Sequence, residues 1–233
     1  MRANLRTGYA DMNLNGFLDH LLKSAAPTSM SGNDGRGGLG GMLGSDFGKG
    51  AMAGGALGLL LGRNKTSRKL ATYGGLAALG VMAYRAYGDY RAQQGAPVQP
   101  QTVDRLPPPE AGIHGEAILR ALVAAAKADG HIDAREREVI EGEFARLSPD
   151  AEVQQWMKSE LDKPLDPAEV ARAASTPEIA SEMYLASLVA ADEQNFMERA
   201  YLDELARQLG LDAALRQRLE DEYRTALASP ARR

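Results

Sequence analysis

The chain has 233 residues, 44% of them hydrophobic and 6% aromatic, so it can bury a core built mainly from small side chains. Residues 1–109 carry 12 Lys/Arg against 6 Asp/Glu, a net +6, whereas residues 110–233 carry 15 against 25, a net −10. This division excludes a uniform polyanion-binding protein, and no nucleic-acid partner is expected, because the larger acidic part would repel phosphates. The absence of cysteine excludes a disulfide framework, a thiol nucleophile and a cysteine-based zinc site.

Residues 1–49 are predicted to be a flexible N-terminal region with one short amphipathic helix. The helix is indicated by apolar residues at the spacing of one helical face, Phe17, Leu18, Leu21 and Leu22. Between Gly32 and Gly62, 13 of 31 residues are glycine. This density favours a flexible linker, because ordering glycine costs more backbone entropy than ordering any other residue.

Residues 50–91 contain two apolar, glycine-rich stretches separated by the basic segment 63–69. Glycine recurs at every fourth position of the first stretch and several times in the second. On a helix, the recurring glycines would form a smooth stripe that permits close backbone packing, and self-association of the chain is an expectation of this pattern. The glycines assigned to membrane or helix packing are Gly50, Gly54, Gly58, Gly62, Gly74, Gly75 and Gly80.

The second apolar stretch, Leu70 to Tyr84, carries no charge. At about 1.5 Å per residue it would span about 22 Å, which is less than the roughly 30 Å of a bilayer's hydrocarbon layer. A helix extended to Tyr90 would place tyrosines 73, 84, 87 and 90 at interfacial positions. Three interpretations of residues 50–91 are open: a membrane helix, a shallow membrane hairpin, or a soluble hairpin packed on the rest of the protein. For the first stretch, a plain linker is a fourth.

Residues 92–112 are rich in proline and polar side chains, so we predict an extended, backbone-solvated linker and a domain boundary there. From Ile113 onward, apolar residues recur at helical spacing and no strand pattern competes, which predicts an all-α domain over 113–229. Prolines behind Ser148, Asp166 and Thr176 indicate helix starts. The predicted helices cover 113–128, 134–147, 149–161, 167–174, 177–191, 197–209 and 213–228.

Two similar segments connect consecutive helices of this domain, and we call them the elbows. In ILRALVAAAKADGHIDARE, an apolar helical run stops at Asp129, and Asp133 with Glu136 starts the next helix. In LASLVAADEQNFMERAYLDELA, a helix ends at Asp192, and Asn195 with Glu198 starts the next. The repetition predicts a helical bundle of two pseudo-repeated halves.

The elbow carboxylates have two interpretations. Capping alone accounts for Asp133, Glu136 and Glu198, but not for Asp129 and Asp192, whose charges oppose the dipole at a helix C-terminus. A divalent cation bound by carboxylate oxygens would account for these two as well, with calcium, magnesium and zinc as candidates. The first elbow is not an EF-hand, because it lacks the required glycine and the final glutamate. The candidate metal ligands are Asp129, Asp133, Glu136, Asp192 and Glu198.

No catalytic motif is recognisable. Serine and threonine do not occur in a nucleophile motif, and the glycines of 50–62 lack the Lys-Ser/Thr that follows them in a phosphate loop. His131 is the histidine placed among carboxylates, and we interpret it as a solvated or capping residue. The sequence therefore predicts a protein that is not an enzyme.

From about residue 70 to 228 the chain resembles the tellurite-resistance TerB-like family, and within it the YebE-type branch of bacterial inner-membrane proteins. The resemblance rests on RKLATYGGLAALG, AAAKADGHIDAREREVI and DEQNFMERAYLDELA. It implies a bundle of two related halves, a divalent-metal site at the acidic elbows, no enzymatic activity and a role in membrane-linked stress or metal response. This chain departs from the family pattern at Asp192, which is followed by glutamate instead of glycine.

These observations favour a non-enzymatic, membrane-associated protein that binds membrane lipid, a divalent metal and a protein partner. We expect it at the bacterial inner membrane with the acidic domain in the cytoplasm, since no cleavable signal peptide is visible and cysteine is absent. The alternative is a soluble cytoplasmic interaction scaffold without a metal site and with a flexible N-terminal arm.

Overall fold

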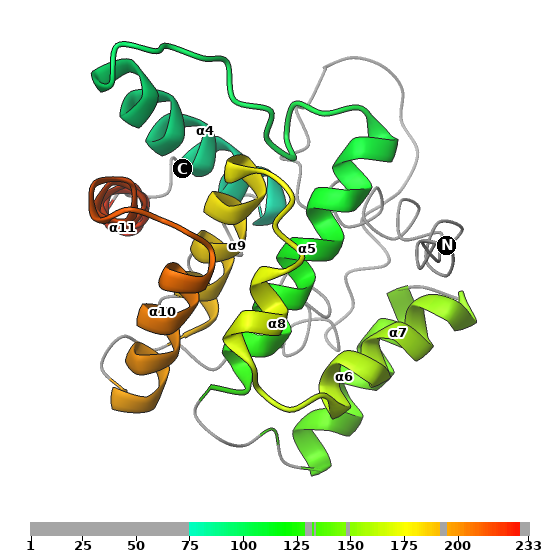
Figure 1. Cartoon of the computed structure of the whole chain (residues 1–233). Helices are drawn as coiled ribbons and strands as arrows, with labels where there is room; N and C mark the ends of the chain where they lie inside the picture. The colour runs from blue at the N-terminus through cyan, green and yellow to red at the C-terminus, as the bar shows by residue number, and fades with distance from the viewer. Residues whose placement is uncertain (1–74, 129–131, 133, 148–149, 192–194, 229–233) are drawn as a thin grey trace, which may run out of the picture.

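The computed structural model describes residues 75–128, 132, 134–147, 150–191 and 195–228. These residues form eight helices and no strand, which confirms the predicted all-α class (Figure 1). The helices are α4 (Gly75–Gln93), α5 (Pro108–Ala126), α6 (Ala134–Leu147), α7 (Ala151–Asp162), α8 (Pro167–Ala171), α9 (Pro177–Ala190), α10 (Phe196–Gln208) and α11 (Ala213–Ala228).

Helix α9 is the centre of the core. Every residue from Ile179 to Ala190 is buried, and the helix packs against α4, α5, α10 and α11. In Figure 1 it lies among these helices. A helix made mostly of apolar residues needs such a position, because it has little polar surface to present to water.

Helices α5 and α9 run in the same direction. Near their starts, His114 Nδ1 of α5 lies 2.5 Å from a carboxylate oxygen of Glu182 in α9. Further along, the hydroxyl of Ser187 in α9 donates to the carbonyl oxygen of Ala121 in α5 over 3.5 Å. The residue numbers rise together on both helices, so the two helices are parallel and end at the same end of the molecule (Figure 1).

Side-chain caps determine where several helices begin. Asp166 and Thr176 accept hydrogen bonds from backbone N–H groups in the first turns of α8 and α9, as predicted. The predicted start at Pro149 is wrong: α7 begins at Ala151, and its cap is Asp150, which accepts from the N–H of Glu152 over 2.9 Å. The aspartate cap Asp150, two residues after the predicted cap Ser148, therefore determines this start.

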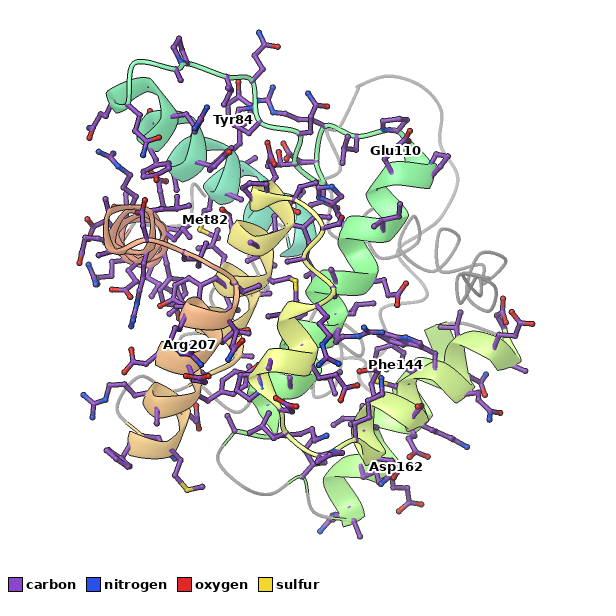
Figure 2. The ribbon with its side chains drawn as sticks, in the orientation of Figure 1. Met82, Tyr84, Glu110, Phe144, Asp162 and Arg207 are labelled. Carbon is purple, nitrogen blue, oxygen red and sulfur yellow. The ribbon has the colours of Figure 1, made fainter. Side chains whose placement is uncertain are left out.

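Helix α4 is part of the same core. Leu79, Met82 and Ala86 are buried where α4 contacts α9 and α11, and Figure 2 shows Met82 at this junction. None of the described helices combines the length and apolarity needed to cross a membrane.

The structure corrects the interfacial prediction for three tyrosines of α4, Tyr84, Tyr87 and Tyr90, because they contact protein groups. The guanidinium of Arg105 lies 3.8 Å from the centroid of the Tyr84 ring, and Figure 2 shows Tyr84 on the side of α4 that faces the chain segment after it. Tyr87 is buried, and the Tyr90 hydroxyl donates to Asp212, the residue before α11. Tyr73 lies outside the described residues.

The segment 96–107, which we call the connecting segment, joins α4 to α5 and is not a solvated tether. Thr102 and Val103 are buried, and the Val103 N–H donates to Glu182 of α9 over 2.6 Å. Helix α5 also starts earlier than predicted, at Pro108 instead of Ile113. The local composition suggested a linker, but a contact with a residue 79 positions away holds this backbone in place.

Gly80 is the predicted packing glycine for which the structure gives contacts. A Cβ atom at this position would come within 3.0 Å of the Asp104 backbone nitrogen, so the glycine permits close approach to the connecting segment rather than to another helix. Gly75 is the first residue of α4. Gly50, Gly54, Gly58, Gly62 and Gly74 lie outside the described residues.

We expect Gly80→Ala to lower the free energy of unfolding by about 1–3 kcal/mol, because the added methyl group would overpack the contact with Asp104. Gly88→Ala is the matched control in the same helix. Its Cβ would meet Pro100 at an ordinary 3.7 Å, so the higher helix propensity of alanine should stabilise the protein by about 0.5–1 kcal/mol. Urea denaturation of both variants tests this, and equal effects at the two positions would contradict it.

Candidate functional site

The two elbows follow α5 and α9, which terminate on the same side of the molecule. Because α5 and α9 are parallel, Ala128 and Ala191, the last described residues before the two elbows, follow helix ends at the same end. The next helices begin at Ala134 and Phe196. Of the predicted ligands, Asp129, Asp133 and Asp192 lie outside the described residues, and for Glu136, in the first turn of α6, the structure describes the backbone but not the side chain.

Glu198 is the predicted ligand whose side chain is described. It is buried in the first turn of α10, where the positive end of the helix dipole stabilises a carboxylate. Asn195 caps this helix as predicted, since its side-chain oxygen accepts from the N–H of Met197 over 2.9 Å. Within the described part of the chain, no three His, Asp or Glu side chains lie close enough together to hold a metal ion. A cation at the elbows would therefore need ligands from residues outside that part.

A buried polar cluster on α9 was not predicted. Glu182 is fully buried; one of its oxygens accepts from the Val103 N–H at 2.6 Å, and the other lies 2.5 Å from His114 Nδ1. Burial raises the pKa of the Glu182 carboxyl, and the hydrogen bonds from His114 and Val103 only partly oppose this effect. A signal was present in the sequence, because Glu182 is a carboxylate in the middle of a helix whose other residues are mostly apolar.

The connecting segment forms the outer part of this cluster. The buried hydroxyl of Thr102 donates to the Asp104 carboxylate over 2.6 Å, and Asp104 also pairs with Arg105 at 3.6 Å. The pair of His114 and Glu182 can hold a proton, but its side chains are only 8% and 0% exposed. It is therefore closed to a substrate in this conformation.

Comparison with known proteins places the chain in a family. Residues 46–223 match the family model described as "Protein of unknown function (DUF533)". The chain belongs to the DUF533 family. A relative in Yersinia enterocolitica, described as "Uncharacterized protein in ampR 5'region", is 34% identical over 109 residues, which are 47% of this chain and 78% of the relative. No solved structure matches the chain.

The DUF533 match extends well beyond the predicted helical domain. It begins before α4 and continues through the connecting segment into α11. In the structure, α4 and the connecting segment share a core with α5, α9 and α11. The family region and the packed core therefore both include the predicted linker, residues 92–112.

A shallow cleft in this DUF533 protein lies between α5, α7 and α8. The Lys127 amine donates to the carbonyl oxygens of Glu160 and Lys163 at the end of α7, and burial lowers its pKa. Glu160 is buried and pairs with Arg120 at 3.3 Å and Lys163 at 2.6 Å. The free volume is about 20 Å³, enough for one water molecule and far below the roughly 300–1,000 Å³ of a small-molecule site. We interpret these charges as contacts that hold α7 on α5.

Proposed function

We propose that this protein is a non-enzymatic helical module that binds a divalent cation at its two elbows. The observation that supports the proposal is the parallel contact of α5 and α9. Ala121 and Ser187 are hydrogen-bonded to each other, and Asp129 and Asp192 follow them by only eight and five residues along the chain. Parallel helices bring the negative ends of two dipoles together, and a cation between the elbows would neutralise them together with the aspartates.

A metal-free interaction scaffold is the second candidate, and it is favoured by the observed cap of α10. Asn195 satisfies a backbone N–H at the start of that helix without any ion. If Asp133 caps α6 in the same way, helix capping accounts for both elbows. The two candidates differ in their response to divalent cations.

For the cellular setting, we propose attachment to the cytoplasmic face of the bacterial inner membrane together with a protein partner, as the resemblance to the YebE-type branch implies. The net charge of +6 on residues 1–109 supports attraction to an anionic lipid surface. The described tyrosines of α4 contact protein groups, so lipid contact would fall mainly on residues before α4. Recovery of all the full-length protein in the supernatant after ultracentrifugation of cell lysate at physiological salt would contradict membrane attachment.

The cation proposal predicts a metal-dependent gain in stability. At a hundred-fold excess over Kd, a cation bound only to the folded state adds about 2.7 kcal/mol. The thermal unfolding midpoint of the full chain should therefore rise when calcium, magnesium or zinc replaces EDTA. In Asp129→Asn this rise should shrink, because a charged ligand is lost.

Asp150→Asn is the matched control, because it removes one carboxylate from the cap of α7, and asparagine caps a helix about as well as aspartate. Its response to cations should equal that of the wild type. In a metal-free scaffold, the wild-type midpoint would not respond to any of the three cations. Asp129→Asn would then be as stable as the wild type or slightly more so, because a carboxylate that opposes the helix dipole is gone.

A further inference from the structure

Glu182 joins three parts of the fold through its two carboxylate oxygens. It belongs to α9, its Oε2 lies 2.5 Å from His114 of α5, and its Oε1 accepts from the N–H of Val103 in the connecting segment over 2.6 Å. Glu182 and Thr102 are completely shielded from solvent. Water therefore cannot replace any of these hydrogen bonds while the segment is in place.

The charge of this buried group depends on one proton. When His114 and Glu182 share a proton, the pair has no net charge, whether the His114 ring or the Glu182 carboxyl carries it. When the proton leaves, a buried carboxylate anion remains, and Asp104 adds a second negative charge nearby. An uncompensated charge away from water is strongly destabilising, so loss of the proton favours conformations in which solvent reaches Glu182.

Among the described residues, the charges that act on Glu182 are His114 from α5 and Asp104 from the connecting segment. The guanidinium of Arg105 pairs with Asp104 and covers the Tyr84 ring of α4. Elsewhere on α9, Glu178 acts on Tyr87 of α4, and Tyr184 interacts with Glu220 and Arg216 of α11. Arg216 hydrogen-bonds to Glu220 and Asp203, so this cation is already engaged elsewhere.

The connecting segment links Glu182 to α4. Gly80 of α4 lies against Asp104, and Arg105 stacks on Tyr84, so two contacts of the segment with α4 are next to the hydrogen bond at Val103. Helix α4 in turn covers apolar surface of α9 and α11 with Leu79, Met82 and Ala86. Release of the segment would remove these two contacts and weaken the hold of α4 on that surface.

We propose that the proton shared by His114 and Glu182 is a latch, and that its loss as the pH rises frees the connecting segment and loosens α4 from α9 and α11. In the latched state the apolar surface under α4 is covered. In the released state the same surface becomes accessible to solvent. The device makes exposure of this surface depend on pH, while the hydrogen bond between Ser187 of α9 and Ala121 of α5 lies further along both helices.

Hydrogen exchange of the full chain between about pH 6 and 9 tests the latch. After correction for intrinsic exchange rates, protection of the Val103 amide should fall by about tenfold per pH unit between the pKa of the released form and that of the buried pair, and it should level off above the latter. Peptides from α4 should lose protection over the same interval. In Glu182→Gln the side chain stays neutral, accepts from the Val103 N–H and donates to His114. Protection of the segment in this variant should stay constant as the pH rises.

Glu178→Gln is the control, because it makes the same change one turn earlier on α9, where no hydrogen bond to the segment exists. It should keep the wild-type pH dependence. The latch is refuted if wild-type protection of the segment is constant over this range, or if Glu182→Gln loses it with the wild-type profile. If Glu182→Gln does not fold, the wild type decides. The ¹³C shift of the Glu182 carboxyl then has to titrate at the pH where the fall in protection ends, and a shift that stays constant over the whole measured range overturns the proposal.

Discussion

Replacement of His114 by alanine is expected to lower the free energy of unfolding by about 3–5 kcal/mol at pH 8, because it leaves Glu182 buried without its partner. Ile113→Ala is the control on the neighbouring residue. The Ile113 side chain is 58% exposed, so its truncation should change the free energy of unfolding by no more than about 0.5 kcal/mol. Urea denaturation of both variants measures the difference.

The loss caused by His114→Ala should depend on pH in a defined direction. Burial raises the pKa of Glu182, and His114 opposes this rise, so the pKa should rise further in the variant. A carboxyl with a raised pKa in the folded state contributes stability that is present below its unfolded pKa of about 4.3 and is lost as the pH rises through the folded value. The variant should therefore be closest to the wild type near pH 5 and furthest from it near pH 8. A loss of the same size at both pH values would contradict a charged Glu182 as its cause.

Leu185→Ala is the second substitution with a large expected effect. Leu185 is completely buried in the middle of α9, where the helix contacts its neighbours on all sides. Truncation should cost about 2–5 kcal/mol, because it removes buried apolar surface and leaves a cavity that rigid helices cannot close. Leu165→Ala, in the exposed loop before α8, should cost much less. Similar losses for both variants in urea denaturation would show that α9 is not the centre of the core.

Local signals predicted most of the helices. The ranges 134–147 and 213–228 were predicted to the residue, and Asp166 and Thr176 marked the starts of α8 and α9. These features depend on side chains within a few positions of the helix start, which can be read directly from a sequence. The start of α5 was missed although Pro108 and Glu110 are typical of a first helical turn, because the proline-rich composition was interpreted as a linker.

Contacts between residues far apart in the chain were not predictable in the same way. His114 and Val103 reach Glu182 across 68 and 79 positions, and no periodicity in one segment indicates such a partner. A membrane interface was one of the open interpretations for the tyrosines of α4 for the same reason, since Arg105 and Asp212 are visible as the partners of Tyr84 and Tyr90 only in three dimensions. At the candidate metal site, the capping role of Asn195 is confirmed, whereas the metal-binding role of the elbow carboxylates stays a prediction.

The parallel packing of α5 and α9 also affects how the protein emerges from the ribosome. The hydrogen-bonded residues Ala121 and Ser187 are 66 positions apart, so the face of α5 that packs on α9 lacks this partner until α9 has been synthesised. At about 5–20 residues per second this delay is roughly 3–13 s, much longer than the formation of a single helix. During translation the alanine-rich face of α5 is therefore available to chaperones, and a nascent chain stalled before Pro177 would keep it exposed.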